Sequence, residues 1–131
     1  VGLLLITHNN IGASLLQTAV RVLDCCPLRA ETLAVTDESR KDVLTAEAEK
    51  MIHQLDVGDG VMILTDLFGS SPANIANALR GHGGVRVLTG VNLPMLIRVL
   101  NYPTLPLDEM AQKALSGGRD GVLLCQRGET G

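Results

Sequence analysis

Aromatic side chains are nearly absent from this sequence of 131 residues, which contains one Phe, one Tyr and no Trp. Recognition of nucleic acid by stacking bases on aromatic rings is therefore not expected. The net charge is −3 and no run of Lys or Arg occurs, so neither nucleic acid nor an anionic membrane surface is expected as a partner. The longest apolar runs are about six residues, far below the roughly 20 that cross a bilayer, and we expect no membrane insertion.

Cysteine is also scarce. Cys25, Cys26 and Cys125 have the spacing of neither a disulfide framework nor a metal site. We interpret them as small apolar residues in a reducing cytoplasm, with redox sensing as the alternative. No signal-peptide pattern is visible, and we expect a cytoplasmic protein that uses no cofactor and no metal.

Segments with the pattern of buried strands alternate with segments that have the apolar periodicity of helices. This alternation favours an α/β fold with a parallel sheet. Strands are predicted at residues 1–6, 29–35, 59–65, 85–89 and 121–125. Helices are predicted at 11–23, from a cap at Asp37 or Ser39 to Leu55, at 73–80 after Ser71 as N-cap and Pro72, from Asn92 to about Leu100, and from Asp108 to about Ser116.

A short chain with right-handed crossovers leaves few topologies. The common small arrangement has strand order 2-1-3-4, with the fifth strand at an edge, and makes strands 1 and 3 neighbours. We expect one domain over residues 1–125, followed by a polar tail over residues 126–131.

Three polar residues are predicted to meet where strands 1 and 3 end. His8 follows the first strand, Asp66 follows the third, and Ser71 begins the next helix. A carboxylate that accepts a hydrogen bond from one imidazole nitrogen fixes the tautomer and leaves the other nitrogen nucleophilic. A helix N-terminus suits a phosphoryl dianion. Together these residues predict a histidine that takes a phosphoryl group and passes it on.

Each residue also has a plainer interpretation. A histidine at a strand end is typically a loop residue bonded to backbone, Asp66 can anchor its own turn, and Ser71-Pro72 is a common helix start. Only their joint placement favours the functional interpretation. The other two histidines, His53 and His82, are interpreted as surface residues.

The residues around this site resemble a known family. Residues 64–74 (LTDLFGSSPAN), residues 89–96 (TGVNLPML), the early Thr7-His8 and the late segment 116–122 are similar to the IIA component of mannose-family (mannose, fructose and sorbose) sugar phosphotransferase systems, which depend on phosphoenolpyruvate. The similarity extends over nearly the whole chain. It implies a doubly wound α/β domain whose last strand runs antiparallel and is exchanged between the subunits of a homodimer.

The resemblance also implies roles for the three residues. His8 would accept phosphate on Nε2 from a histidine phosphocarrier protein and pass it to a histidine of a IIB component. Asp66 would orient His8, and Ser71 would lie near the phosphoryl group. Two positions depart from the family, since Asn9 and Ser70 stand where glycine is usual.

Three alternatives remain to be compared. A receiver domain phosphorylated on Asp66 needs an acidic pair after the first strand, where the chain has Asn9-Asn10. A serine hydrolase using Ser71 needs a Gly-x-Ser-x-Gly elbow, but Pro72 and Ala73 follow the serine. A regulatory sensor of phosphorylation state, in a system without a sugar permease, would use the same site as the phosphoryl carrier.

Overall fold

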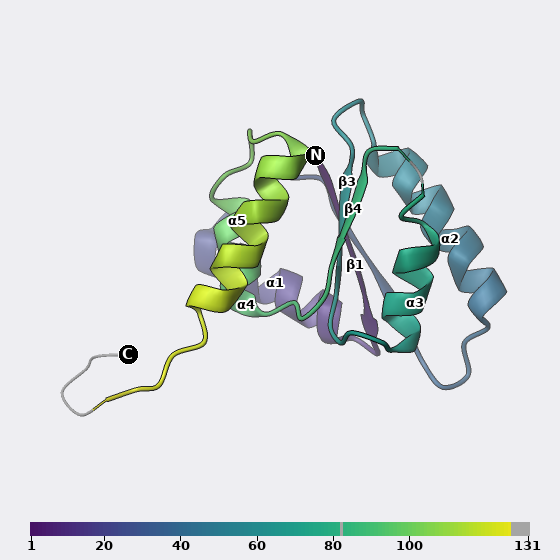
Figure 1. Ribbon diagram of the computed structural model, residues 1–131, viewed down its shortest axis with the longest axis horizontal. Coiled ribbons are helices and arrows are strands. Elements are labelled where there is room, and N and C mark those ends of the chain that lie inside the picture. Colours follow the sequence, from purple (N-terminus) through teal and green to yellow (C-terminus); the bar gives the residue numbers. More distant parts are fainter. Residues whose placement is uncertain (82, 127–131) are drawn as a thin grey trace.

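The computed structural model of the protein describes residues 1–81 and 83–126. Its centre is a parallel sheet of four strands in the order β2-β1-β3-β4, as the sequence predicts (Figure 1). The strands are β1 (Gly2–His8), β2 (Ala30–Val35), β3 (Val61–Thr65) and β4 (Val85–Leu88). The two central strands are the most apolar because both of their faces are covered.

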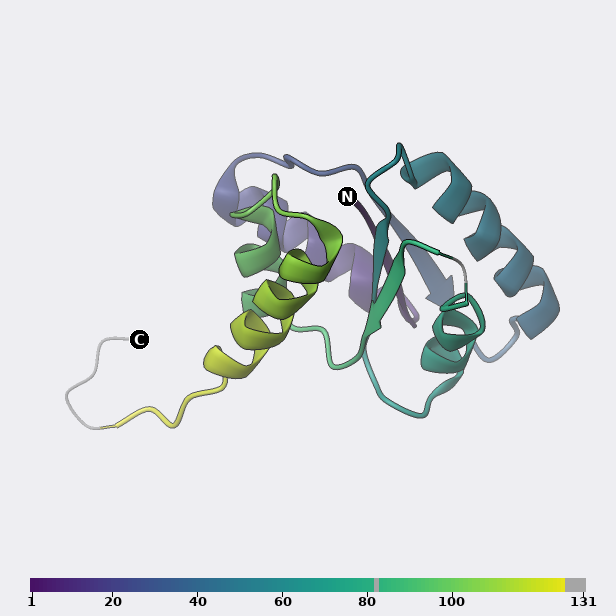
Figure 2. The same cartoon turned by 45° about the horizontal axis from the view of Figure 1, so that its top comes forward.

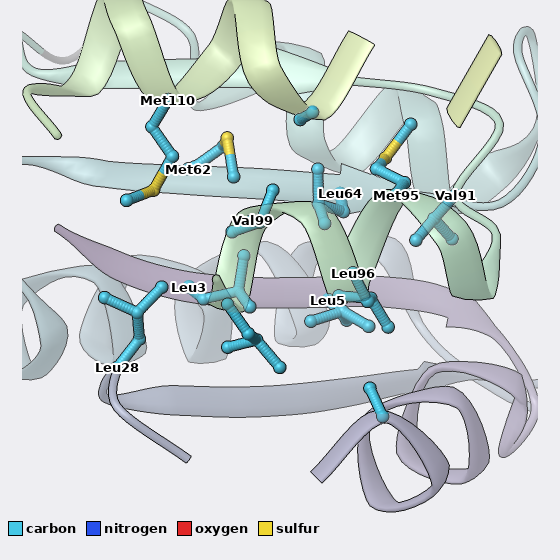
Figure 3. Close-up of a cluster of buried hydrophobic side chains, with 13 residues drawn as sticks. Leu3, Leu5, Leu28, Met62, Leu64, Val91, Met95, Leu96, Val99 and Met110 are labelled. Atoms are coloured by element: carbon cyan, nitrogen blue, oxygen red, sulfur yellow. The ribbon is translucent and has the colours of Figure 1, made fainter. Parts of the chain in front are cut away.

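Helices cover both faces of the sheet, as expected (Figures 1 and 2). One face carries α1 (Ile11–Leu23), α4 (Leu93–Leu100) and α5 (Leu107–Asp120), and the other carries α2 (Lys41–Leu55) and α3 (Ser71–Ala78). Figure 3 shows the first of these interfaces, where Leu5 and Leu64 of the sheet pack among apolar side chains of the helices. Burial of each such leucine contributes about 1.5–3 kcal/mol. No helix in the described ranges is long and apolar enough to span a membrane.

Two helix starts differ from the prediction. The N-cap of α3 is Ser70 rather than Ser71, so that Ser71 and Pro72 are the first helical residues. The N-cap of α2 is Arg40, because the hydroxyl of Ser39 accepts the backbone N–H of Thr36 instead of capping the helix. The predicted start of α4 is confirmed, since Asn92 is its N-cap and its side chain accepts the backbone N–H of Met95.

The last helix extends further than the sequence predicts. Gly117 and Gly118 lie inside α5, not at its end, because α5 packs closely against α4. A Cβ added at Gly117 would lie 2.5 Å from the Cβ of Arg98, and one at Gly118 would lie 2.9 Å from the Cε of Met95. The glycines therefore permit a helix crossing, and their usual role as helix terminators is overridden.

The segment after α5 is separated from the sheet. Residues 122–126 pair with no strand of the described chain and extend away from the body of the molecule (Figures 1 and 2). Val122, Leu123 and Leu124 are each more than three-quarters exposed. The predicted strand at 121–125 is thus not formed within one chain. His82 and residues 127–131 of the predicted tail lie outside the described residues.

Candidate functional site

The candidate site lies at the carboxyl edge of the sheet, where β1 and β3 end side by side. Ile6 is the register partner of Thr65, so the chain that continues from each strand emerges at the same place. His8 is the last residue of β1, and Asp66 directly follows β3. Parallel pairing of two strands that are distant in sequence therefore brings the predicted histidine and aspartate together.

Asp66 holds His8 through one oxygen atom. Its Oδ2 accepts a hydrogen bond from Nδ1 of the ring at 2.8 Å and another from the backbone N–H of His8 at 3.1 Å. A carboxylate can only accept, so in the neutral ring Nδ1 carries the proton and Nε2 keeps its lone pair. The Asp66 side chain is 13% exposed and the His8 side chain 40% exposed. The acid is largely shielded, while the imidazole remains accessible.

The backbone around His8 is fixed by two residues that the sequence analysis did not assign a role. The buried Thr7 accepts the Gly12 N–H on Oγ1 at 2.8 Å, which ties the end of β1 to the start of α1. Asn9 has a φ of +49° and donates its N–H to the Val35 carbonyl. Asn tolerates this left-handed conformation better than most other side chains, which explains why it can occupy this turn. An Asn directly after a strand is the signal that could have indicated this turn.

The N-terminus of α3 lies at the same edge and is not capped by a side chain. The hydroxyl of Ser70 donates to the Leu67 carbonyl at 2.6 Å instead of accepting from the helix. The first N–H groups of a helix have no intrahelical partner. Pro72 has no N–H and Ala73 is fully buried, so the N–H of the exposed Ser71 is the one that α3 offers an anion.

Ser71 is on the helix beside the histidine, but the structure does not join the two. Within the described residues no hydrogen bond links Ser71 to His8 or Asp66. Ser71 instead lines a polar cavity of about 260 Å³ together with residues of the β2–α2 connection and α3, including Thr36, Asp37 and Asn74. Its predicted contact with a phosphoryl group remains a prediction.

The arrangement can support nucleophilic chemistry at an imidazole nitrogen. The described residues include no group of three or more His, Cys, Asp or Glu side chains placed to hold a metal ion. An oriented histidine, a shielded carboxylate and an uncapped helix N-terminus suit transfer of a phosphoryl dianion.

Comparison with known proteins gives one consistent result. Residues 2–114 match the family model described as the fructose IIA component of the phosphotransferase system, EIIA-man. Over 126 residues the chain is 30% identical to the mannose-specific EIIAB component of Escherichia coli strain K12, covering 88% of this chain but 36% of that protein. The chain thus spans about a third of the length of the curated relatives it matches first.

Two solved structures have the same fold. The mannose/sorbose-specific IIA subunit from Enterococcus faecalis superposes with a TM-score of 0.87 at 23% identity, over 99% of this chain and 98% of that one. A IIA protein associated with the fucose utilization operon of Streptococcus pneumoniae gives a TM-score of 0.74 at 26% identity, over 88% of each chain.

Proposed function

Because the chain belongs to the mannose-type family of phosphotransferase-system IIA components, we propose that it is a phosphoryl carrier whose acceptor atom is Nε2 of His8. The observation that carries this proposal is the 2.8 Å hydrogen bond between His8 Nδ1 and Asp66 Oδ2. That bond assigns the proton to Nδ1 and leaves Nε2 as the nucleophile.

The proposed transfer needs no redox change and no cofactor. Nε2 of His8 attacks the phosphorus of a phosphohistidine on a histidine phosphocarrier protein. The new P–N bond forms as the donor's P–N bond breaks, and the donor ring keeps the electron pair of the broken bond. The proton on Nδ1 stays hydrogen-bonded to Asp66, which stabilises the positive charge that develops on the ring.

The N–H of Ser71 at the start of α3 would donate to a phosphoryl oxygen, with the Ser71 hydroxyl as an additional donor. In the next step a histidine of a IIB component attacks the same phosphorus and regenerates His8. We place this relay in the cytoplasm, in the service of sugar uptake and phosphorylation.

We further propose that the chain works as a homodimer joined by its C-terminal segment. In the described chain β4 pairs only with β3, so its other edge is open. An open edge and an exposed apolar segment suit each other, because residues 122–125 of a second copy could pair at that edge and bury Val122, Leu123 and Leu124.

The test is phosphorylation by a labelled histidine phosphocarrier protein. We expect label on the wild-type protein that is lost in acid and retained in base, as phosphohistidine requires, whereas an acyl phosphate on Asp66 would be lost in both. His8→Ala should abolish labelling, and His53→Ala, which changes an exposed histidine on α2, should not. Label that persists on His8→Ala would show that the acceptor is elsewhere.

A further inference from the structure

Apolar side chains next to the His8–Asp66 pair are exposed. Phe68, the only Phe of the chain, is 80% exposed, and the neighbouring Leu67 is 60% exposed. Two peptide links of about 3.8 Å each separate the Cα of Phe68 from that of Asp66, so the two Cα atoms lie within about 7.6 Å of each other. The residue that carries this exposed aromatic ring is therefore close along the chain to the carboxylate that holds the proposed phosphoryl acceptor.

The turn that carries these side chains is held in one shape. Both the hydroxyl and the backbone N–H of Ser70 donate to the Leu67 carbonyl, at 2.6 and 3.4 Å. Gly69 supplies the positive φ of +78° that the turn needs. We call residues 67–70 the rim turn. Because it is already ordered, binding a partner through it costs little conformational entropy.

Apart from Asp66, the segments that flank the rim turn and the imidazole along the chain are uncharged, while Asp37 and Lys41 line the cavity at Ser71. Residues 8–14 and 67–74, which flank the imidazole, contain no Lys, Arg, Asp or Glu, and neither do residues 88–93. Ile11, on the α1 side of His8, is 45% exposed. Apolar contact, and not attraction between opposite charges, is therefore the attractive force that this part of the edge offers a partner.

We propose that the rim turn is the docking element for the phosphocarrier protein that delivers the phosphoryl group to His8, with Phe68 as its anchor. This inference rests on the function proposed above. A standard protein interface covers about 800 Å² per partner, a disc of roughly 16 Å radius, so a protein centred on the imidazole also covers the rim turn. Exposed aromatic residues near the centre of an interface are the ones that commonly dominate its binding energy.

We assign the rim turn to the phosphoryl donor protein and not to a IIB acceptor. A IIB acceptor is needed only where the chain feeds sugar uptake, whereas a donor protein is needed whether the phosphorylated chain serves transport or signalling. A small-molecule donor can reach His8 without covering Phe68. Comparing a protein donor with a small-molecule donor therefore distinguishes a loss of docking from a loss of transfer chemistry.

The experiment compares two phosphoryl donors on the same variants. One donor is the phosphorylated carrier protein, and the other is phosphoramidate, a small P–N compound that phosphorylates imidazoles directly. For Phe68→Ser we expect KM for the carrier to rise about tenfold, in line with an aromatic anchor, while the rate with phosphoramidate is unchanged. Phe68→Leu should retain most of the affinity, and Leu67→Ser should show a smaller loss than Phe68→Ser.

The matched control is Val57→Ser, which removes a 64% exposed apolar side chain from the turn before β3, at the opposite edge of the sheet. It should leave both donors unaffected. A wild-type KM in Phe68→Ser, or an equal loss with both donors, would overturn the docking role. Failure of the wild-type protein to accept phosphate from either donor would instead refute the proposed function.

Discussion

One oxygen atom of Asp66 accepts two hydrogen bonds from His8, from its backbone N–H at 3.1 Å and from its Nδ1 at 2.8 Å. The first bond joins the end of β1 to the loop after β3, and the second orients the ring. Because both donors belong to one residue, the position and the tautomer of the imidazole depend on the same carboxylate.

Removal of that carboxylate should slow phosphoryl transfer without unfolding the protein. For Asp66→Ala we expect transfer from the carrier to be about 10- to 100-fold slower, as is common when a residue that orients a functional histidine is lost. Rapid-quench kinetics measure the rate, and far-ultraviolet circular dichroism checks the fold. Asp59→Ala, which changes an exposed acid in the turn before β3 at the opposite edge of the sheet, is the control. Wild-type kinetics in Asp66→Ala would remove the orienting role.

The hydroxyl of Ser71 is predicted to contact the phosphoryl group. Loss of one hydrogen bond to a charged group in the transition state should make Ser71→Ala about tenfold slower in transfer. Ser39→Ala changes a serine that lines the same cavity from the β2–α2 connection, and it should transfer at the wild-type rate. Equal rates for the two variants would leave Ser71 with a structural role only.

The C-terminal segment is predicted to control the oligomeric state. A chain that stops after Gly121 lacks the exposed residues 122–125 and should sediment as a monomer or become insoluble. A chain that stops after Gln126 keeps them and should remain a dimer. Analytical ultracentrifugation distinguishes the two forms, and a soluble dimer from the shorter chain would contradict strand exchange.

Two glycines of the turn before β3 differ in their surroundings. Gly58 and Gly60 have φ angles of +112° and +88°, and both donate N–H to Oδ1 of Asp56. A Cβ at Gly60 would lie 2.6 Å from the Gly84 carbonyl oxygen, whereas one at Gly58 would meet no described atom within 4 Å. Gly60→Ala should therefore lower the free energy of unfolding by about 1–3 kcal/mol more than Gly58→Ala does. Urea titrations of both variants measure this difference.

The same turn should make stability depend on pH. Hydrogen bonds from the backbone N–H groups of Gly58 and Gly60 hold the pKa of the Asp56 carboxyl below its ordinary value. A lowered pKa in the folded state contributes stability above the ordinary carboxyl pKa, and this contribution is lost as pH falls through the folded-state value.

Asp56→Ala should therefore be less stable than wild type near neutral pH, and the difference should shrink at about pH 3. Urea unfolding at the two pH values is the measurement. Asp59→Ala, which removes an exposed acid from the same turn, is the control for the loss of one negative charge. If the difference in free energy of unfolding between Asp56→Ala and wild type stays constant with pH, titration of Asp56 does not contribute to stability as proposed.

Local sequence patterns were sufficient for most of the secondary structure. The apolar run of β1 and the four-residue spacing of Ile11, Leu15 and Ala19 identified a strand and a helix, because burial imposes a different period on each. Strand order followed from the alternation of the two patterns and from the handedness of crossovers. The proximity of His8 and Asp66 could be predicted in the same way, since neighbouring parallel strands end at one edge.

The tertiary structure decided what depends on contacts between distant segments. Gly117 and Gly118 indicate a helix end when considered locally, yet they continue α5, since close packing against α4 outweighs the weak helix propensity of glycine. The double hydrogen bond from His8 to one oxygen of Asp66 likewise depends on atoms 58 residues apart. Sequence alone thus determined the first four strands, the five helices and their order, because propensity and periodicity are local. The state of residues 121–125 and the geometry of the site required the folded chain, because hydrogen bonds and packing act over a few ångströms in space.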